Sequence, residues 1–170
     1  NHAKTAFVEG VAGGGALFIS PEGKVSVSGG LFEHNSATNL RGDTHGGAIL
    51  NEGSLTIQNT LIQHNYAVAG FYNRHGESGH VGHGNGGAIY HSGETLTIED
   101  STIFNNSASR SGGAMFYTNI ITLKRCTVQN NSAYMGPAFR SPAYTGNPVL
   151  ELCKVFWNSC QIERSSGQAV

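Results

Sequence analysis

The sequence has little charge and no concentration of one sign. Charged side chains make up 12% of the 170 residues, and the formal net charge is −1. Proteins that bind nucleic acid need a concentrated lysine and arginine face. No apolar run approaches the roughly 20 residues of a membrane helix, and no apolar segment of the signal-peptide kind follows the first residues. We therefore expect no nucleic-acid partner and no membrane span in this chain.

Apolar residues and helical patterns are scarce as well. Hydrophobic residues make up only 38% of the chain, whereas glycine occurs 24 times. A low apolar share indicates a thin, elongated core rather than a sphere. No stretch of ten residues has helical periodicity. We expect one all-β domain over residues 1–170, and we interpret it as a segment of a longer surface protein.

What the sequence does contain is a motif that recurs five times. Each copy opens with a glycine-rich tetrad and closes with asparagine. The tetrads begin at Gly14, Gly46, Gly86, Gly112 and Gly136, and the closing residues are Asn35, Asn65, Asn106, Asn131 and Asn158. The opening and closing residues are 19–22 positions apart, but 5–21 positions separate a closing asparagine from the next tetrad. One arc of constant length with insertions at one corner is typical of a solenoid.

The middle of each copy alternates between apolar and polar residues, as in Val25-Ser26-Val27 and Leu55-Thr56-Ile57. This period predicts a strand with one buried face, and a further short strand precedes each closing asparagine. Three parallel strands per coil predict a parallel β-helix of about five coils, stacked about 4.8 Å apart. The crossover preference of parallel strands makes it right-handed.

The repeated glycines and asparagines have structural roles in such a stack. A glycine pair suits a sharp corner where φ is positive or two backbones approach closely. An asparagine at each exit can adopt the left-handed conformation and bond to the coils above and below through its amide. We therefore interpret the five closing asparagines as a structural ladder.

The Gly-Gly-Ala-Ile tetrads at 46–49 and 86–89 and the Phe-x-x-Asn motif at 32–35 resemble the repeat of the polymorphic outer-membrane proteins, a bacterial autotransporter family with β-helical passengers. The resemblance covers about Gly13 to Ser159, with Pro137 in place of the second glycine in the fifth copy. It implies a right-handed β-helix in a non-enzymatic adhesin or structural module, extracellular or at the cell surface. It carries over no catalytic residue and no cofactor.

A glycan-processing enzyme is an alternative function, because parallel β-helices also host lyases, hydrolases and epimerases. Such sites need clustered carboxylates, and the acidic residues here are scattered. Glu99-Asp100 is an exception in sequence, but neighbours in a strand should point to opposite faces. Asp100 is level with Arg125 one coil further on, so a cross-coil ion pair is the expected use.

The longest insertion, Tyr66 to Asn85, is the candidate binding loop. Its binding candidates are Phe71, Tyr72, Arg74, His75, His80 and His83. His80-x-x-His83 could hold a metal, but the loop has no cysteine or aspartate to complete a site, so we assign no metal. The insertion should pack beside Asn39 to His45, which leaves the same corner one coil earlier. The partners we expect are proteins, further copies of the chain, or host or matrix glycans.

After each glycine pair come two apolar columns. These are Leu17, Ile49, Ile89, Met115 and Phe139, then Phe18, Leu50, Tyr90 and Phe116. Neighbouring strand residues cannot both point inward, so one column should form an outer apolar stripe. The stripe is either a partner surface or covered by the loops.

Cysteine and asparagine suggest two modifications. Cys126 and Cys153 occupy one column of adjacent coils, within disulfide range, and a disulfide would fit an extracellular location. Stacked free thiols are the alternative, and the pairing of Cys160 stays open. Asn105 and Asn130 begin glycosylation sequons and should point outward.

The two ends of the stack are open sheet edges. They call for continuation into a longer chain or for end-to-end polymerisation. A subunit of an extracellular filament is therefore a further alternative function.

Overall fold

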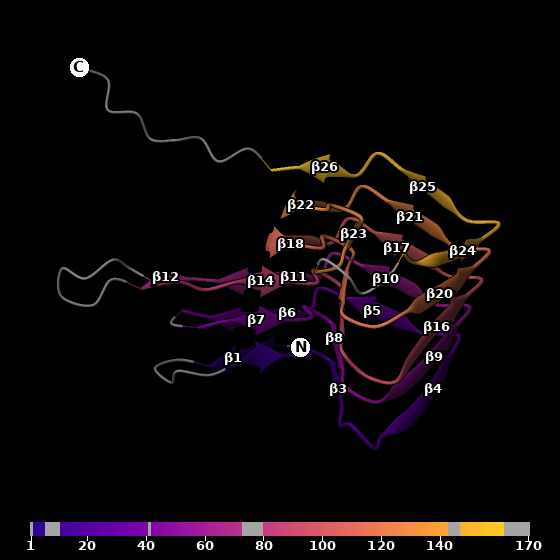
Figure 1. The fold of residues 1–170 in the computed structure, drawn as a ribbon, viewed down its shortest axis with the longest axis horizontal. Coiled ribbons are helices and arrows are strands. Elements are labelled where there is room, and N and C mark those ends of the chain that lie inside the picture. Colours follow the sequence, from indigo (N-terminus) through magenta and orange to yellow (C-terminus); the bar gives the residue numbers. More distant parts are fainter. Residues whose placement is uncertain (1, 6–10, 41, 73–79, 143–146, 162–170) are drawn as a thin grey trace.

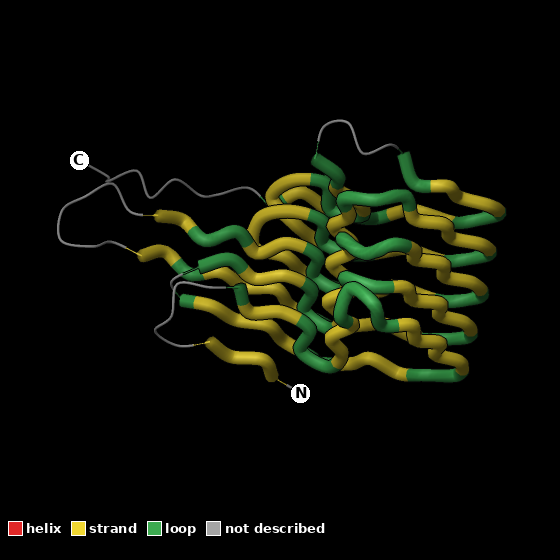
Figure 2. The backbone as a smooth tube through the Cα atoms, turned by 60° about the horizontal axis from the view of Figure 1, so that its bottom comes forward, coloured by secondary structure: helices red, strands yellow, loops and turns green. Residues whose placement is uncertain are grey.

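The computed structural model describes residues 2–5, 11–40, 42–72, 80–142 and 147–161, and every regular element among them is a strand. Short parallel strands stack coil on coil into a parallel β-helix, as Figures 1 and 2 show. The predicted fold class is confirmed. We call the five stacked turns coils 1 to 5, each beginning at its glycine tetrad.

Three sheets of five parallel strands form the wall of the helix. The first contains β3 (Leu17–Ile19), β8 (Ile49–Asn51), β15 (Ile89–His91), β19 (Met115–Tyr117) and β23 (Phe139–Arg140). The second contains β4 (Lys24–Ser28), β9 (Ser54–Gln58), β16 (Thr95–Glu99), β20 (Ile121–Lys124) and β24 (Val149–Glu151). The third contains β5 (Leu31–Glu33), β10 (Leu61–Gln63), β17 (Thr102–Phe104), β21 (Thr127–Gln129) and β25 (Lys154–Phe156).

A fourth strand in each coil, directly after the closing asparagine, was missed by the sequence analysis. These strands are β6 (Ser36–Asn39), β11 (Tyr66–Ala69), β18 (Ser107–Ser111), β22 (Ser132–Met135) and β26 (Ser159–Cys160), and β1 (His2–Thr5), which precedes coil 1, pairs with β6 in the same sheet. Short segments before the glycine pairs join the same sheet: β2 (Ala12–Gly13), β7 (Thr44–His45) and β14 (Gly84–Asn85). The expectation of three strands per coil is therefore wrong, because Ser-Ala segments carry too few apolar residues to be read as strands.

The strand register reproduces the predicted columns. Leu96 pairs with Leu55 below and Ile121 above, and Ile103 pairs with Ile62 and Val128 in the third sheet. These six side chains are buried in one continuous core that runs along the helix axis. Aliphatic side chains thus stack on one another, and each inner coil is closed off from water by its two neighbours.

The glycine corners are as predicted, since the first glycine of every tetrad has φ between 57° and 71°. The expectation that the closing asparagines adopt the left-handed conformation is wrong. The residue before each of them does so instead: His34, His64, Asn105, Asn130 and Trp157, with φ of 52–55°. That geometry turns the next side chain inward, and the asparagine is then free to bond along the axis.

The asparagine ladder itself is present. The amide oxygen of Asn106 accepts bonds from the backbone N–H and the side-chain amide of Asn65, at 3.0 and 2.9 Å. Asn106 in turn donates to the amide oxygen of Asn131 at 3.0 Å and to the carbonyl of Ile62 at 3.0 Å. Asn35 and Asn158 continue the same pattern at the two ends. Buried backbone groups at this corner are therefore satisfied by side chains of the adjacent coil.

Candidate interaction surface

The two corner insertions together form one projection from the β-helix, which we call the arm. Its described parts are 36–40 and 42–45 from coil 1 and 66–72 and 80–85 from coil 2. In Figure 1 it extends to the left of the stacked coils, through β6 and β7 and through β11, β12 and β14. In coil 3 the same corner is closed by only Ser109 and Arg110, between residues that pair with Ala67 and Asn85.

Backbone pairing joins the two halves of the arm. β11 pairs with β6 over four residues, and β14 pairs with β7 on the return. The Thr44 hydroxyl donates to the Val68 carbonyl at 3.1 Å, and the His83 N–H donates to Asp43 Oδ1 at 2.9 Å. The prediction that the two insertions pack side by side is confirmed. The arm is thus a small paired unit and not two separate loops.

The predicted binding residues are distributed within this arm. Phe71 and Tyr72 form β12 (Phe71–Tyr72), which pairs antiparallel with β13 (His80–Val81). Arg74 and His75 lie outside the described residues. His83 lies at the base of the arm, half-buried, and its N–H is bonded to Asp43. Among the described residues no group of three or more metal-ligating side chains is arranged to hold a metal ion.

The outer apolar stripe exists, but β2, which precedes coil 1 and is not part of the arm, covers its residue in coil 2. Ile49, Ile89 and Met115 point into the core, so the second column is the outer one. Phe18 at its end is 55% exposed, whereas Leu50 is only 8% exposed. Gly13 of β2 lies against Leu50, close enough that a Cβ there would overlap with it. The residue that lies against Leu50 thus comes from β2 rather than from the two long insertions that the prediction named, and an exposed surface remains at Phe18.

The aromatic rings of the stripe stack along the helix axis. Tyr90 is parallel to His45 with ring centroids 3.9 Å apart, and Phe116 of the next coil is parallel to Tyr90 at 5.2 Å. Burial lowers the pKa of His45 and raises that of Tyr90, which also lies near Asp43 and Glu52. Because the faces of these rings are stacked against one another, only the ring edges are presented to solvent. They therefore do not form a flat platform for a sugar ring.

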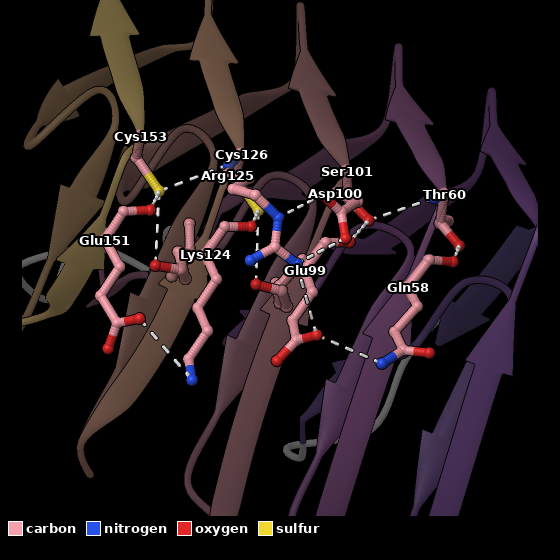
Figure 3. A network of polar contacts seen from close by, with 12 residues as sticks. Gln58, Thr60, Glu99, Asp100, Ser101, Lys124, Arg125, Cys126, Glu151 and Cys153 are labelled. Atoms are coloured by element: carbon pink, nitrogen blue, oxygen red, sulfur yellow. Dashed lines mark hydrogen bonds and ion pairs between the residues drawn. The ribbon is translucent and has the colours of Figure 1, made fainter.

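A row of polar side chains crosses the coils at the end of the second sheet (Figure 3). Arg125 donates two hydrogen bonds to the Asp100 carboxylate, at 2.6 and 2.7 Å, which confirms the predicted cross-coil pair. These bonds lower the pKa of Asp100. Glu99 also lies 3.8 Å from Arg125. The expectation that Glu99 and Asp100 point to opposite faces is wrong, because Asp100 sits in a left-handed turn with φ of 47°. Both carboxylates therefore lie beside one guanidinium.

The cysteines belong to a second ladder beside this row. Ser101 Oγ accepts the Thr60 N–H at 3.1 Å and donates to the carbonyl of Glu99 at 2.6 Å. Cys153 Sγ accepts the Cys126 N–H at 3.4 Å, and the Cys126 thiol donates to the Lys124 carbonyl at 3.3 Å, in the same pattern (Figure 3). Each sulfur thus occupies the position, and makes the type of hydrogen bond, that a hydroxyl group has in the coils below.

The predicted disulfide is not formed, because Cys126, Cys153 and Cys160 are all free thiols. The shared column is confirmed, and the alternative of stacked thiols describes it. Burial raises the pKa of Cys126 to about 11. Cys160 pairs in register with the buried Ala133 of coil 4 but is itself exposed.

The two sequon asparagines are exposed at the left-handed corner, as predicted. Asn105 Nδ2 lies 2.8 Å from Nδ1 of His64, and the ring of His64 stacks on His34 with centroids 5.0 Å apart. The corner before the asparagine ladder is thus a second exposed row, made of two histidines and the two sequon residues.

One buried polar group was missed by the sequence analysis. His91 is fully buried in the core between Asn51 and Tyr117, and its Nδ1 lies 2.9 Å from the Asn51 amide. Its Nε2 has no hydrogen-bond partner. Burial lowers the pKa of His91 to about 4. The alternation Ile89 in, Tyr90 out, His91 in was the available signal.

No protein-family model matches the chain, and no curated protein or solved structure matches it either. No helix in the described residues is long and apolar enough to cross a membrane. The arm, the stripe at Phe18 and the polar rows are therefore interpreted from their own geometry.

Proposed function

We propose that the chain is a non-enzymatic extracellular or cell-surface module in which a rigid β-helix presents the arm to a binding partner. The observation that carries the proposal is the joining of two corner insertions into one paired projection. Insertions on a stacked scaffold cost the core nothing, and binding residues concentrate on such segments.

The exposed side chains of the arm suit a protein or glycan partner. Tyr66, Val68 and Leu40 are exposed on its described part, next to serine and threonine side chains of the same sheet. Tyrosine supplies large contact area at low entropic cost, and small hydroxyl residues adapt their hydrogen bonds. The resemblance to polymorphic outer-membrane proteins points the same way, toward adhesion at a surface.

The described carboxylates support a structural role over glycan processing. Asp100 and Glu99 are engaged by Arg125, and Glu151 lies 3.6 Å from Lys124. A general acid needs a raised pKa, whereas the pKa of Asp100 is lowered. The pairs therefore serve best as links between coils.

Coil 3 supplies the design of the test. Replacing 38–44 and 68–84 each with Ser-Arg, the two residues that close the corner in coil 3, removes the arm and leaves the coils intact. The full chain should bind on an array of host and matrix glycans or on intact cells, and the armless chain should not, at unchanged circular dichroism. Equal binding by a folded armless chain would refute the role of the arm.

A second control keeps the arm and changes the opposite wall. Thr97→Lys lies on the outer face of the second sheet and should leave binding unchanged. Loss of binding in this variant would place the contact on the wall of the helix.

A further inference from the structure

Coil 5 differs from the coils before it at two positions on its open side. Pro137 stands where the earlier coils have the second glycine of the tetrad. Pro148 immediately precedes Val149, which pairs with Thr122, so it takes the place of Ile121 in coil 4. Both positions bear on whether anything can be added to the end of the β-helix.

The second glycine normally donates a hydrogen bond to the following coil. The N–H of Gly47 donates to the carbonyl of Gly86, and that of Gly87 to the carbonyl of Gly112, both at 2.9 Å. The Gly113 N–H donates to Gly136 in the same way at 3.3 Å. Proline has no N–H, so coil 5 lacks this one donor toward a coil beyond it, although the corner residues on either side, equivalent to Gly112 and Ala114 of coil 4, keep theirs.

The same glycine also lets the next backbone approach closely. A Cβ placed on Gly47 would overlap with the carbonyl oxygen of Gly87, and a Cβ on Gly87 would overlap with that of Gly113. Pro137 carries a Cβ and a ring. A further coil at the spacing of the inner coils would therefore bring its carbonyl into collision with Pro137.

Pro148 removes a second donor that faces the same way. In the second sheet, alternate N–H groups point to the next coil, as Asp100 and Arg125 show by donating to Lys124 and Glu151. Ile121 lies four residues before Arg125, so its N–H has the same direction in the parallel ladder. Pro148 occupies the position equivalent to Ile121 in coil 5, and it has no N–H to donate to a further coil.

We propose that coil 5 is built as an end, and that Pro137 and Pro148 stop β-sheet stacking on its open side. Neither a second copy of the chain nor a further coil of this kind extends the helix from that face. The inference does not depend on what the arm binds, and it argues against a filament grown from this end.

Moving one coil tests the proposal. A second copy of coil 4, residues 112–135, is placed either directly after 135 or directly after 161. Amide hydrogen exchange then reports whether the copy docks. The copy inside the stack should be protected about as well as coil 4 itself, because its own glycine pair faces coil 5 as that of coil 4 does now, and the glycine pair of coil 4 faces the copy. The copy after coil 5 should exchange about as fast as an unstructured peptide.

The prolines are then removed in the chain that carries the outer copy. Pro137→Gly with Pro148→Val should let the outer copy dock and slow its exchange by at least about tenfold. Pro142→Gly, a coil 5 proline outside the two positions, should leave it unprotected. Protection of the outer copy with both prolines present would overturn the proposal. So would an outer copy that stays unprotected in the folded double variant.

Discussion

Acid should destabilise this protein through His91, whose imidazole lies fully buried in the core. Its ordinary pKa of 6.5 applies in the unfolded chain, and burial lowers it to about 4 in the folded chain. The unfolded state therefore binds the proton more tightly. The neutral imidazole leaves stability intact above pH 6.5, and stability is lost as the pH falls from 6.5 toward 4.

The size of the effect follows from the gap between the two pKa values. That gap is worth about 3 kcal/mol when fully expressed, and about 2.5 kcal/mol of it should be lost between pH 7 and pH 4.5. The folded state binds the proton more weakly than the unfolded state, because a proton on Nε2 finds no acceptor in the core.

His91→Leu isolates this contribution. Leucine has a suitable size for the core, and the Asn51 amide keeps a second acceptor, the Thr95 carbonyl at 3.2 Å. The variant removes the unpartnered Nε2 group of His91 but leaves one hydrogen of the Asn51 amide without its acceptor, and each such group costs about 1–3 kcal/mol, so the stability at pH 7 should stay close to that of the wild type. His34→Gln, at an exposed corner, is the matched control.

The measurement is urea denaturation followed by circular dichroism at pH 7, 5.5 and 4.5. Wild type and His34→Gln should lose about 2.5 kcal/mol more than His91→Leu between the first and last pH. Equal losses in wild type and His91→Leu would refute the reasoning, because other titrating groups would then account for all of the acid sensitivity.

Three further predictions concern the ladders. Asn106→Ala should cost about 3 kcal/mol in urea denaturation, since it strands a buried N–H and a carbonyl, and a loss below about 1 kcal/mol would contradict the ladder. Cys126→Ser should leave the melting temperature nearly unchanged, because Ser101 fills the same role one coil below, whereas Cys126→Val should lower it; equal melting of the two variants would argue against the thiol ladder. Asp100→Asn should lower the melting temperature slightly at low salt and not in 1 M salt, and the contribution of the Arg125 pair should vanish as the pH falls below the ordinary aspartate pKa of 3.8.

Much of the fold was predictable because residues that stack on one another occur at the same position in each repeat. Identical spacing before each closing asparagine predicted the register of Leu55 on Leu96 and the level of Asp100 with Arg125. The shared column of Cys126 and Cys153 followed from the same counting. Which residues stack on one another depends only on the number of residues between two corners, and that number is nearly constant in the three wall sheets.

The remainder depended on backbone turns and on small residues. The strand at Ser107–Ser111 has no apolar alternation, so its pairing could not be read from hydrophobic period. The hydrophobic pattern does not show which corner residue adopts the left-handed backbone conformation. Asp100 adopts it, so its side chain lies beside that of Glu99 and does not point to the opposite face, as regular strand alternation would require. The pairing of the arm was predictable from the shared corner, but the cover over Leu50 is Gly13 of β2, a residue outside the arm with no side chain to signal the contact.

The asparagine ladder has a consequence for the electrostatics of the whole module. The bonds between its amides all run the same way, from a nitrogen to the oxygen of the next coil toward coil 5, while the nitrogens of Asn65 and Asn106 also donate to a carbonyl of the preceding coil. Such aligned hydrogen bonds polarise one another, as the peptide groups of an α-helix do. The ladder thereby contributes a dipole component along the axis at this corner. Asn158 ends the row, because its amide nitrogen donates to the carbonyls of Val128 and Phe156.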